Sequence, residues 1–260
     1  MGILNITPDS FSDGGQFISV QEAANHAFKM IDEGVDIIDI GGESTRPGTE
    51  PVPFKEELKR IKPVIKAIRE QTDCLISIDT YKASVAEVAL DLGADIINDI
   101  SSLSYDKNMA NLVSNRKVPV ILMHMQGSPQ DMQFNPNYNN LIDDLIYFFK
   151  TRIKIANKAG ILDNMIILDP GIGFGKNVED NFEIIRELKQ IEAMGYPVLL
   201  GPSRKSFIGK VLNLPVKDRL EGTMASIAVG IINGAKIVRV HDVLEAKRTV
   251  LIVEKLLGKD

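Results

Sequence analysis

The chain contains no tryptophan, few aromatic residues and a single cysteine, and each shortage excludes a class of protein. Cys74 has no partner for an intramolecular disulfide and lacks the spacing of a zinc or redox motif. Aromatic residues make up 6% of the sequence, and its net charge of −5 comes from interleaved acidic and basic residues without a basic stripe. Because nucleic-acid surfaces need positive charge and stacking rings, we expect no nucleic-acid partner.

Long apolar runs are also missing. No stretch approaches the length of a membrane-spanning helix. The first residues, MGILNITPDSF, have neither the basic region nor the apolar core of a secretory signal. We therefore expect no membrane partner and a cytoplasmic location.

What the sequence does contain is an eightfold alternation of short apolar runs and longer amphipathic segments. The apolar runs predict strands over 2–5, 35–40, 75–79, 94–98, 118–124, 165–169, 197–201 and 235–240. The amphipathic segments predict helices over 20–33, 54–71, 82–92, 107–116, 138–159, 179–194, 217–233 and 242–257.

Strands that are apolar throughout are typical of a parallel sheet covered by helices. Eight strand–helix units with no linker predict an α/β protein of one domain, residues 1–260, folded as a parallel (β/α)8 TIM barrel. A doubly wound open sheet is the alternative. The connections after the first two strands, 7–19 and 41–53, are long and rich in glycine and proline. They predict two mobile loops beside a binding site.

A polar residue ends or follows each predicted strand. These residues are Asn5, Asp39, Asp79, Asn98, His124, Asp169, Lys205 and the pair Arg239 and His241. The carboxyl ends of barrel strands meet at one mouth, where the active sites of this fold are found. Any one of them has a plainer interpretation, and Asp39 is a candidate helix cap. The convergence of so many favours a binding site.

Two chemical zones are expected at this mouth. Asp79, Asp169 and Asn98 form an acceptor-rich pocket for a ligand edge crowded with N–H donors.

Arg239, His241 and Asn5 form a separate region suited to an anion or a metal–anion pair. Lys205 lies between the two zones in this interpretation. A heterocycle that carries a phosphate group would satisfy both.

Two further motifs, a phosphate-binding loop and a zinc site, do not meet their full sequence patterns. The segment DPGIGFGK at 169–176 resembles a phosphate-binding loop, but Pro170 and Asn177 break the Walker A pattern. His124 and His241 are far apart in the sequence and have no third ligand, so a zinc site is not indicated.

Seven segments together resemble the dihydropteroate synthase family, in order from the first residues to the last strand. They are NITPDSFSDGG at 5–15, DIGGESTRPG at 39–48, SIDT at 77–80, NDIS at 98–101, DPGIGFGK at 169–176, SRKSF at 203–207 and RVHDV at 239–243. The family condenses 6-hydroxymethyl-7,8-dihydropterin pyrophosphate with p-aminobenzoate, which gives 7,8-dihydropteroate and pyrophosphate for folate synthesis. Members of the family usually carry extra residues before the first strand, often a hairpin that closes the barrel floor, whereas this chain starts on the strand itself. We expect a truncated or trimmed start, which would affect the bottom of the barrel and not the site.

The resemblance implies a role for each residue that matches the family's motifs. The pterin would be bound by Asp79, Asn98, Met123, Asp169 and Lys205, of which Asp79, Asp169 and Lys205 are the expected catalytic residues. The pyrophosphate would be bound by Asn5, Arg239 and His241, with Asn5 also a ligand of Mg²⁺. The aminobenzoate, or a sulfonamide in its place, would contact Thr45, Pro47, Phe174 and Ser206, while Asp13 and Arg46 belong to the mobile loops.

The charges of these groups suggest how the reaction would proceed. Mg²⁺, Arg239 and His241 would stabilise the departing pyrophosphate. Asp79 and Asp169 would stabilise the cation that develops on the pterin methylene, which the aniline nitrogen then attacks. No covalent enzyme intermediate is needed.

Two other functions remain open at this point. A methyltetrahydrofolate-binding methyltransferase uses a similar pocket, and a homologue could have lost its activity. The segments TRPG at 45–48 and SRKS at 203–206, with Asn5, favour the synthase. The family is also commonly dimeric, so we expect a homodimer. The last two helices have apolar residues for such a contact or for the core: Ile227, Val229, Ile231, Leu251, Val253 and Leu256.

Overall fold

The computed structural model describes residues 1–6, 16–44, 48–128, 130–132, 134 and 136–258. Eight strands in this part of the chain form one parallel sheet in sequence order. They are β1 (Gly2–Asn5), β2 (Ile37–Gly41), β3 (Leu75–Asp79), β4 (Ile96–Asp99), β5 (Val120–Met123), β6 (Ile166–Asp169), β7 (Val198–Leu200) and β8 (Ala235–Val238). Each lies within or next to a predicted strand.

The sheet closes on itself where the chain that follows β8 meets β1. Gly2 and Val240 form a parallel bridge. The amide of Ile3 donates to the carbonyl of Val240 at 2.9 Å, and the amide of Val240 donates to the carbonyl of Met1 at 3.0 Å. The predicted barrel is therefore confirmed, and the alternative of an open sheet is wrong.

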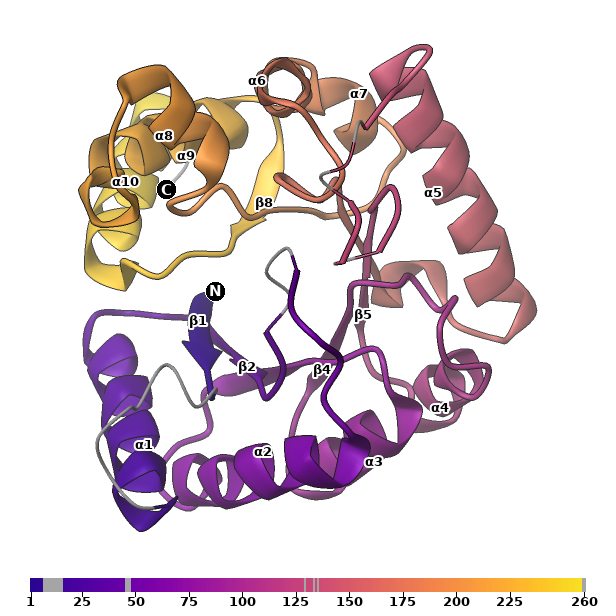
Figure 1. The fold of residues 1–260 in the computed structure, drawn as a ribbon, viewed down its shortest axis with the longest axis vertical. Helices are drawn as coiled ribbons and strands as arrows, with labels where there is room; N and C mark the ends of the chain where they lie inside the picture. Colours follow the sequence, from indigo (N-terminus) through magenta and orange to yellow (C-terminus); the bar gives the residue numbers. More distant parts are fainter. Residues whose placement is uncertain (7–15, 45–47, 129, 133, 135, 259–260) are drawn as a thin grey trace.

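The helices follow one another around the outside of the strands in chain order (Figure 1). They are α1 (Gln16–Asp32), α2 (Phe54–Arg69), α3 (Ala83–Asp91), α4 (Met109–Arg116), α5 (Leu141–Lys158), α6 (Val178–Arg186), α7 (Leu188–Glu192), α8 (Ser206–Leu212), α9 (Leu220–Ile232) and α10 (Val243–Leu256). Within the described ranges, no helix combines the length and the apolar character needed to cross a bilayer.

Two helical regions differ from the prediction. The helix predicted over 179–194 is two helices, α6 and α7, which meet at Glu187. A short helix that was not predicted, α8, precedes the predicted helix over 217–233. Gly209 lies in the middle of α8, and a Cβ there would lie 2.2 Å from the Arg219 guanidinium. Close packing against this side chain therefore stabilises a helix whose sequence signal is weak.

Apolar side chains fill both sides of the sheet. Ile96, Ile121 and Leu199 meet Met1 inside the barrel. Residues on the opposite face of the strands, such as Ile78, pack under the helices as part of the larger core. Burial on both faces explains why the strands are apolar throughout.

Candidate active site

The strand pairing brings polar residues to one level at the barrel mouth. Asn5 pairs with Gly41, Gly41 with Asp79, and Asp79 with Asn98. On the other side of the barrel, Asp169 ends β6 opposite Met123. The register therefore places five predicted site residues around one opening, as the barrel hypothesis requires.

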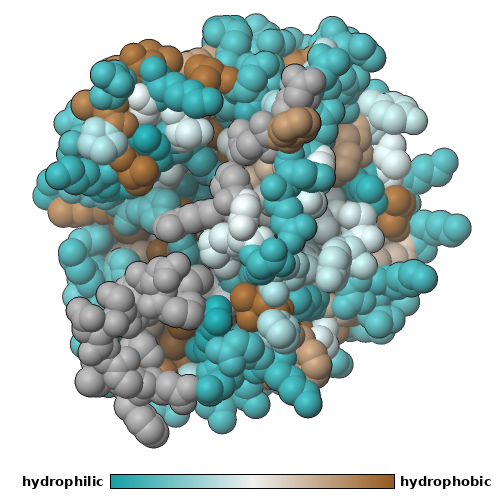
Figure 2. All heavy atoms as spheres, in the orientation of Figure 1, coloured by the Kyte–Doolittle hydropathy of each residue, from teal (hydrophilic) through white to brown (hydrophobic). Residues whose placement is uncertain are grey.

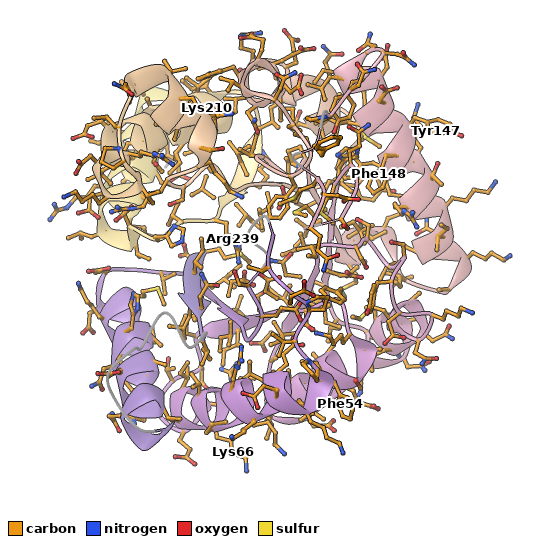
Figure 3. All side chains as sticks on the ribbon, in the orientation of Figure 1. Phe54, Lys66, Tyr147, Phe148, Lys210 and Arg239 are labelled. Atoms are coloured by element: carbon orange, nitrogen blue, oxygen red, sulfur yellow. The ribbon has the colours of Figure 1, made fainter. Side chains whose placement is uncertain are left out.

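Arg239 lies between two buried aspartates at the centre of this opening (Figure 3). Its Nε donates to Asp39 Oδ2 at 2.6 Å, and its Nη2 donates to Asp79 Oδ2 at 2.8 Å. Burial disfavours the charge of the guanidinium, but the two carboxylates raise its pKa further above the usual range. Arg239 is therefore part of the carboxylate cluster, and it also lines the outer part of the site with Asn5 and His241, the other residues of the predicted anion region.

Asp39 belongs to the same cluster and is not a helix cap. It is fully buried, and its Oδ2 accepts from Asn98 Nδ2 at 3.1 Å as well as from Arg239. Asn98 is thereby oriented, and its own Oδ1 is buried with no hydrogen-bond partner among the described residues. A buried amide oxygen without a partner is costly unless a ligand donates to it. Asn98 therefore presents an acceptor to a ligand.

Asp169 and Lys205 lie on the far side of the opening. Asp169 is buried and accepts from the amide of Gly171 at 2.7 Å. Lys205 Nζ lies 4.1 Å from the centre of the Phe174 ring. This cation–π contact holds the ammonium and the ring together on one wall of the opening.

These residues line two pockets that share part of their walls, a narrow inner part and a larger outer part of the cavity. Asn98, Met123 and Asp169 line the inner part, and Asp79, Phe174, Gly201, Lys205 and Arg239 line both parts. The outer part has a volume of about 1110 Å³ and is also lined by Asn5, Ser44, Ser203, Ser206 and His241. Such a volume suits a small-molecule site.

Burial shifts the pKa values of several groups in this cavity. It raises the pKa of Asp79 to about 7, although Arg239 opposes the shift. It lowers the pKa of Lys205 to about 8, assisted by the positive charge of Arg239. Burial also raises the pKa of Asp169. Groups that titrate near neutral pH in a cleft are typical of a catalytic site.

His241 is held in a fixed orientation by Ser203. The Ser203 hydroxyl lies 2.9 Å from His241 Nδ1, and it accepts from the His241 amide at 3.1 Å. Burial is the main cause that lowers the pKa of His241 to about 4, and the positive charge of Arg239 contributes to this decrease. The ring is therefore neutral at neutral pH. When the Ser203 hydroxyl donates to Nδ1, the ring proton is on Nε2, from which it can be donated to an anion.

Comparison with known proteins gives a consistent result. The family model described as "Pterin binding enzyme" matches residues 1–241. A curated dihydropteroate synthase of Clostridium beijerinckii is 53% identical over 260 residues, which cover 98% of this chain and 94% of that protein. The chain belongs to the dihydropteroate synthase family. It is a transferase of folate biosynthesis.

Two solved structures of dihydropteroate synthases support the same family. That of Clostridium difficile, determined in the presence of pteroic acid, has a TM-score of 0.94 and 48% identity and covers 100% of this chain and 96% of its own. That of Yersinia pestis, in complex with a sulfonamide drug, has a TM-score of 0.94 and 43% identity and covers 99% of this chain and 94% of its own. These relatives favour the synthase over the methyltransferase alternative.

The structure brings together the site residues predicted for a dihydropteroate synthase wherever it describes them. Asn5, Asp79, Asn98, Met123, Asp169, Phe174, Lys205, Ser206, Arg239 and His241 all line the cavity. Asp13, Thr45, Arg46 and Pro47 lie outside the described residues. In the part of the chain that is described, no three His, Cys, Asp or Glu side chains cluster as a metal site.

The sequence placed His124 among the residues of the mouth and did not predict two side-chain pairs. His124 was expected at the mouth, but it is buried against Lys176 and Phe148. The Asp39–Arg239 pair and the Ser203–His241 pair were not predicted, because their members are 200 and 38 positions apart. Asp39 and Arg239 have opposite charges and were both expected at the barrel mouth, and this was the sequence signal that could have indicated the first pair.

Proposed function

We propose that the cavity binds 6-hydroxymethyl-7,8-dihydropterin pyrophosphate and p-aminobenzoate and condenses them to 7,8-dihydropteroate and pyrophosphate. The observation that carries this proposal is the free, buried Asn98 Oδ1 beside Asp79 and Asp169, in a cavity that also contains Lys205 and His241. A pterin edge supplies N–H donors, and its pyrophosphate supplies negative charge. The pteroic acid named with the Clostridium difficile structure supports this choice.

The inner part of the cavity would hold the pterin. Asp79, Asn98 and Asp169 offer oxygen acceptors to its N–H groups, while Met123 packs beside it. Because Asp39 and Arg239 fix Asn98 and Asp79, these acceptors are preorganised before the ligand arrives.

The outer part would hold the pyrophosphate beside Arg239, Lys205 and His241. Arg239 already shares its charge with two carboxylates, so Lys205 and the Nε2 proton of His241 are the groups most available to the leaving anion.

Asn5 would bind Mg²⁺ together with the substrate. A Cβ on Gly41 would lie 3.5 Å from Asn5 Oδ1 and 3.7 Å from Asp79 Oδ2, so the glycine leaves space beside the two oxygens. Mg²⁺ commonly takes one or two protein ligands and completes its shell with water and substrate phosphates. When bound, the ion would neutralise the growing charge on the pyrophosphate.

The reaction then breaks one bond and forms another. The C–O bond between the pterin methylene and the pyrophosphate breaks, and its electrons leave with the pyrophosphate. Asp79 and Asp169 stabilise the resulting cation, because carboxylates in a sheltered site interact strongly with positive charge. The amine of p-aminobenzoate forms the new C–N bond and loses one proton to water.

The aminobenzoate would occupy the outer cavity against Phe174 and Ser206. Thr45 and Pro47 are assigned to the same pocket, and Asp13 and Arg46 to loops that cover it, by family resemblance alone. The sulfonamide complex of the Yersinia pestis relative supports a pocket of this kind.

A coupled assay of pyrophosphate release tests the proposed function. We expect release that requires both p-aminobenzoate and Mg²⁺, and that stops when the metal is chelated and resumes when it is added back. Release without p-aminobenzoate would indicate a hydrolase, and release that persists after chelation would contradict the metal assignment.

We further propose that the protein acts as a homodimer in the cytoplasm. Five exposed side chains on neighbouring helices, the α9–α10 apolar face, would form the contact: Val229, Ile232, Leu251, Ile252 and Leu256. Figure 2 shows apolar side chains at the surface over the region where Figure 1 places α8 to α10. An exposed apolar face of this kind is typical of a protein interface.

A further inference from the structure

A buried lysine lies next to the cavity without lining it. Lys176 ends the glycine-rich segment DPGIGFGK and is only 3% exposed. Its Nζ lies 3.0 Å from His124 Nδ1, 3.3 Å from the His124 carbonyl and 2.9 Å from the Phe174 carbonyl. An ammonium has three donors, and here it meets three acceptors.

His124 is suited to accept from this lysine. Burial, assisted by the charge of Lys176, lowers the pKa of His124 to about 2, so the ring is neutral. Because an ammonium can only donate, its contact with Nδ1 requires the lone pair on Nδ1 and the ring proton on Nε2. The ring is held edge-to-face against Phe148, with the ring centres 4.7 Å apart. His124 therefore provides a fixed anchor at the end of β5.

In the described part of the chain no carboxylate lies within ion-pair distance of the buried Lys176 ammonium, whose partners are the His124 ring and two carbonyl oxygens. Burial lowers its pKa to about 7, while Asp169 and Asp180 act in the opposite direction and Lys205 adds to the decrease. Burying a charge against neutral acceptors is expensive, so the contacts it makes need an explanation.

The backbone that Lys176 holds leads directly to the substrate cavity. Gly171 and Gly175 adopt left-handed φ values of +68° and +63°, and a Cβ on either would lie 1.9 Å or 2.3 Å from a carbonyl oxygen of the neighbouring β5 loop. Between them, the Phe174 carbonyl accepts from Lys176 while its ring lines the cavity under Lys205.

We propose that Lys176, anchored on His124, is a positioning residue that fixes the Phe174 ring and so determines how well the site binds the arylamine substrate. The inference rests on the proposed function, because it assigns Phe174 to the aminobenzoate pocket. Lys176 itself does not touch the substrate. Because Phe174 also lines the inner part of the cavity, the effect of Lys176 should be larger on the arylamine than on the pterin pyrophosphate, without being confined to the arylamine.

The test compares steady-state constants of Lys176→Met with those of the wild type. We expect KM for p-aminobenzoate to rise about tenfold, the scale of the one charge-assisted hydrogen bond that Lys176 donates to the Phe174 carbonyl, with KM for the pterin pyrophosphate and kcat within about threefold. Equal changes in both KM values, or no change, would contradict the inference. A wild type without pyrophosphate release would instead refute the proposed function.

Two matched variants of His124 test the same inference if Lys176→Met does not fold. Asparagine places its amide oxygen near the position of a histidine Nδ1, so His124→Asn should keep KM for p-aminobenzoate near the wild-type value. His124→Leu removes the acceptor and should raise that KM. If both variants behave alike, the anchor has no positioning role.

A double-mutant cycle then tests whether Lys176 acts through Phe174. If it does, Lys176→Met adds little to the KM effect of Phe174→Leu, since the ring it positions is already gone. Additive effects would mean that Lys176 acts through another group.

Discussion

Arg239 is the residue on which the geometry of the site depends. It reaches from the end of β8 to Asp39 on β2 and Asp79 on β3, and the first of these carboxylates is fully buried. Asn98 is oriented by the same Asp39. One guanidinium therefore compensates two buried carboxylates and, through Asp39, indirectly orients the Asn98 amide.

Arg239→Ala should cost stability as well as substrate binding. Removing one partner of a buried pair leaves uncompensated charge, which costs about 3 kcal/mol. Asp79 already has a pKa near 7, above its unfolded value, so it takes up a proton in the folded variant as pH falls. We expect the loss of stability, measured by urea unfolding, to be smaller at pH 5 than at pH 8.

The matched control is the double variant Asp39→Asn with Arg239→Ala, which removes a carboxylate together with its counter-charge. It should be more stable than Arg239→Ala alone. If Arg239→Ala loses the same free energy of unfolding at pH 5 as at pH 8, the explanation by uncompensated charge is wrong.

Asp79 should control the acid side of the pH profile. Its carboxylate forms as pH rises through about 7, and the Lys205 ammonium is lost above about 8, so kcat/KM for the pterin substrate should have a narrow maximum between them. Asp79→Asn keeps the shape, removes the charge and should lower kcat by about 100-fold. The Asp79→Asn variant should also lose the fall of kcat/KM at acid pH. An unchanged kcat would exclude the cation-stabilising role of Asp79.

At the scale of elements, the β6–α6 loop is the most constrained segment beside the cavity. Gly171 has φ +68°, and a Cβ there would lie 1.9 Å from the His124 carbonyl oxygen, so the backbone must move to accept any side chain.

Gly171→Ala should therefore be destabilised by about 3 kcal/mol and lose affinity for p-aminobenzoate. Gly195 is the control, because it has φ +88° with open space around its Cβ position, so that Gly195→Ala should cost only about 1 kcal/mol. Urea midpoints and titration with p-aminobenzoate measure both effects. If the two variants are equally stable, the close approach to His124 has no energetic consequence.

The sequence predicted the strands better than the helices. Strands buried on both faces leave a continuous apolar signal, as in β3 and β5. The sequence did not predict α8 because this helix is short and contains Gly209. The helix also depends on packing against Arg219, a contact that only the folded chain supplies. The site residues were predicted as a set, but pairings such as Asp39 with Arg239 depend on strand register that no local pattern contains.

At the scale of the whole molecule, the structure separates core from surface on the last two helices. Of the six apolar residues singled out there, Ile227, Ile231 and Val253 are buried, so they belong to the core. The other three, Val229, Leu251 and Leu256, are exposed, with Leu256 at 80%. Only the exposed group is available for the proposed dimer.

Leu251→Glu should dissociate that dimer. A charge at the centre of an apolar contact is buried without a partner, which opposes association. Light scattering after size exclusion should give about twice 28.7 kDa for the wild type and about 28.7 kDa for the variant. Tyr147→Glu, on the exposed side of α5 (Figure 3), should remain dimeric. A monomeric wild type, or a dimeric Leu251→Glu, would exclude this interface.

The place of Arg239 directly after the eighth strand has a consequence for synthesis on the ribosome. The same short stretch, residues 238–240, joins the two edges of the sheet and delivers the cation that Asp39 and Asp79 require. A nascent chain still lacking it would hold two buried carboxylates without a counter-ion and an open barrel edge. Capacity to bind a pterin should therefore arise abruptly once residues 238–240 have been synthesised, and no polypeptide that ends before this stretch should compete for the substrate.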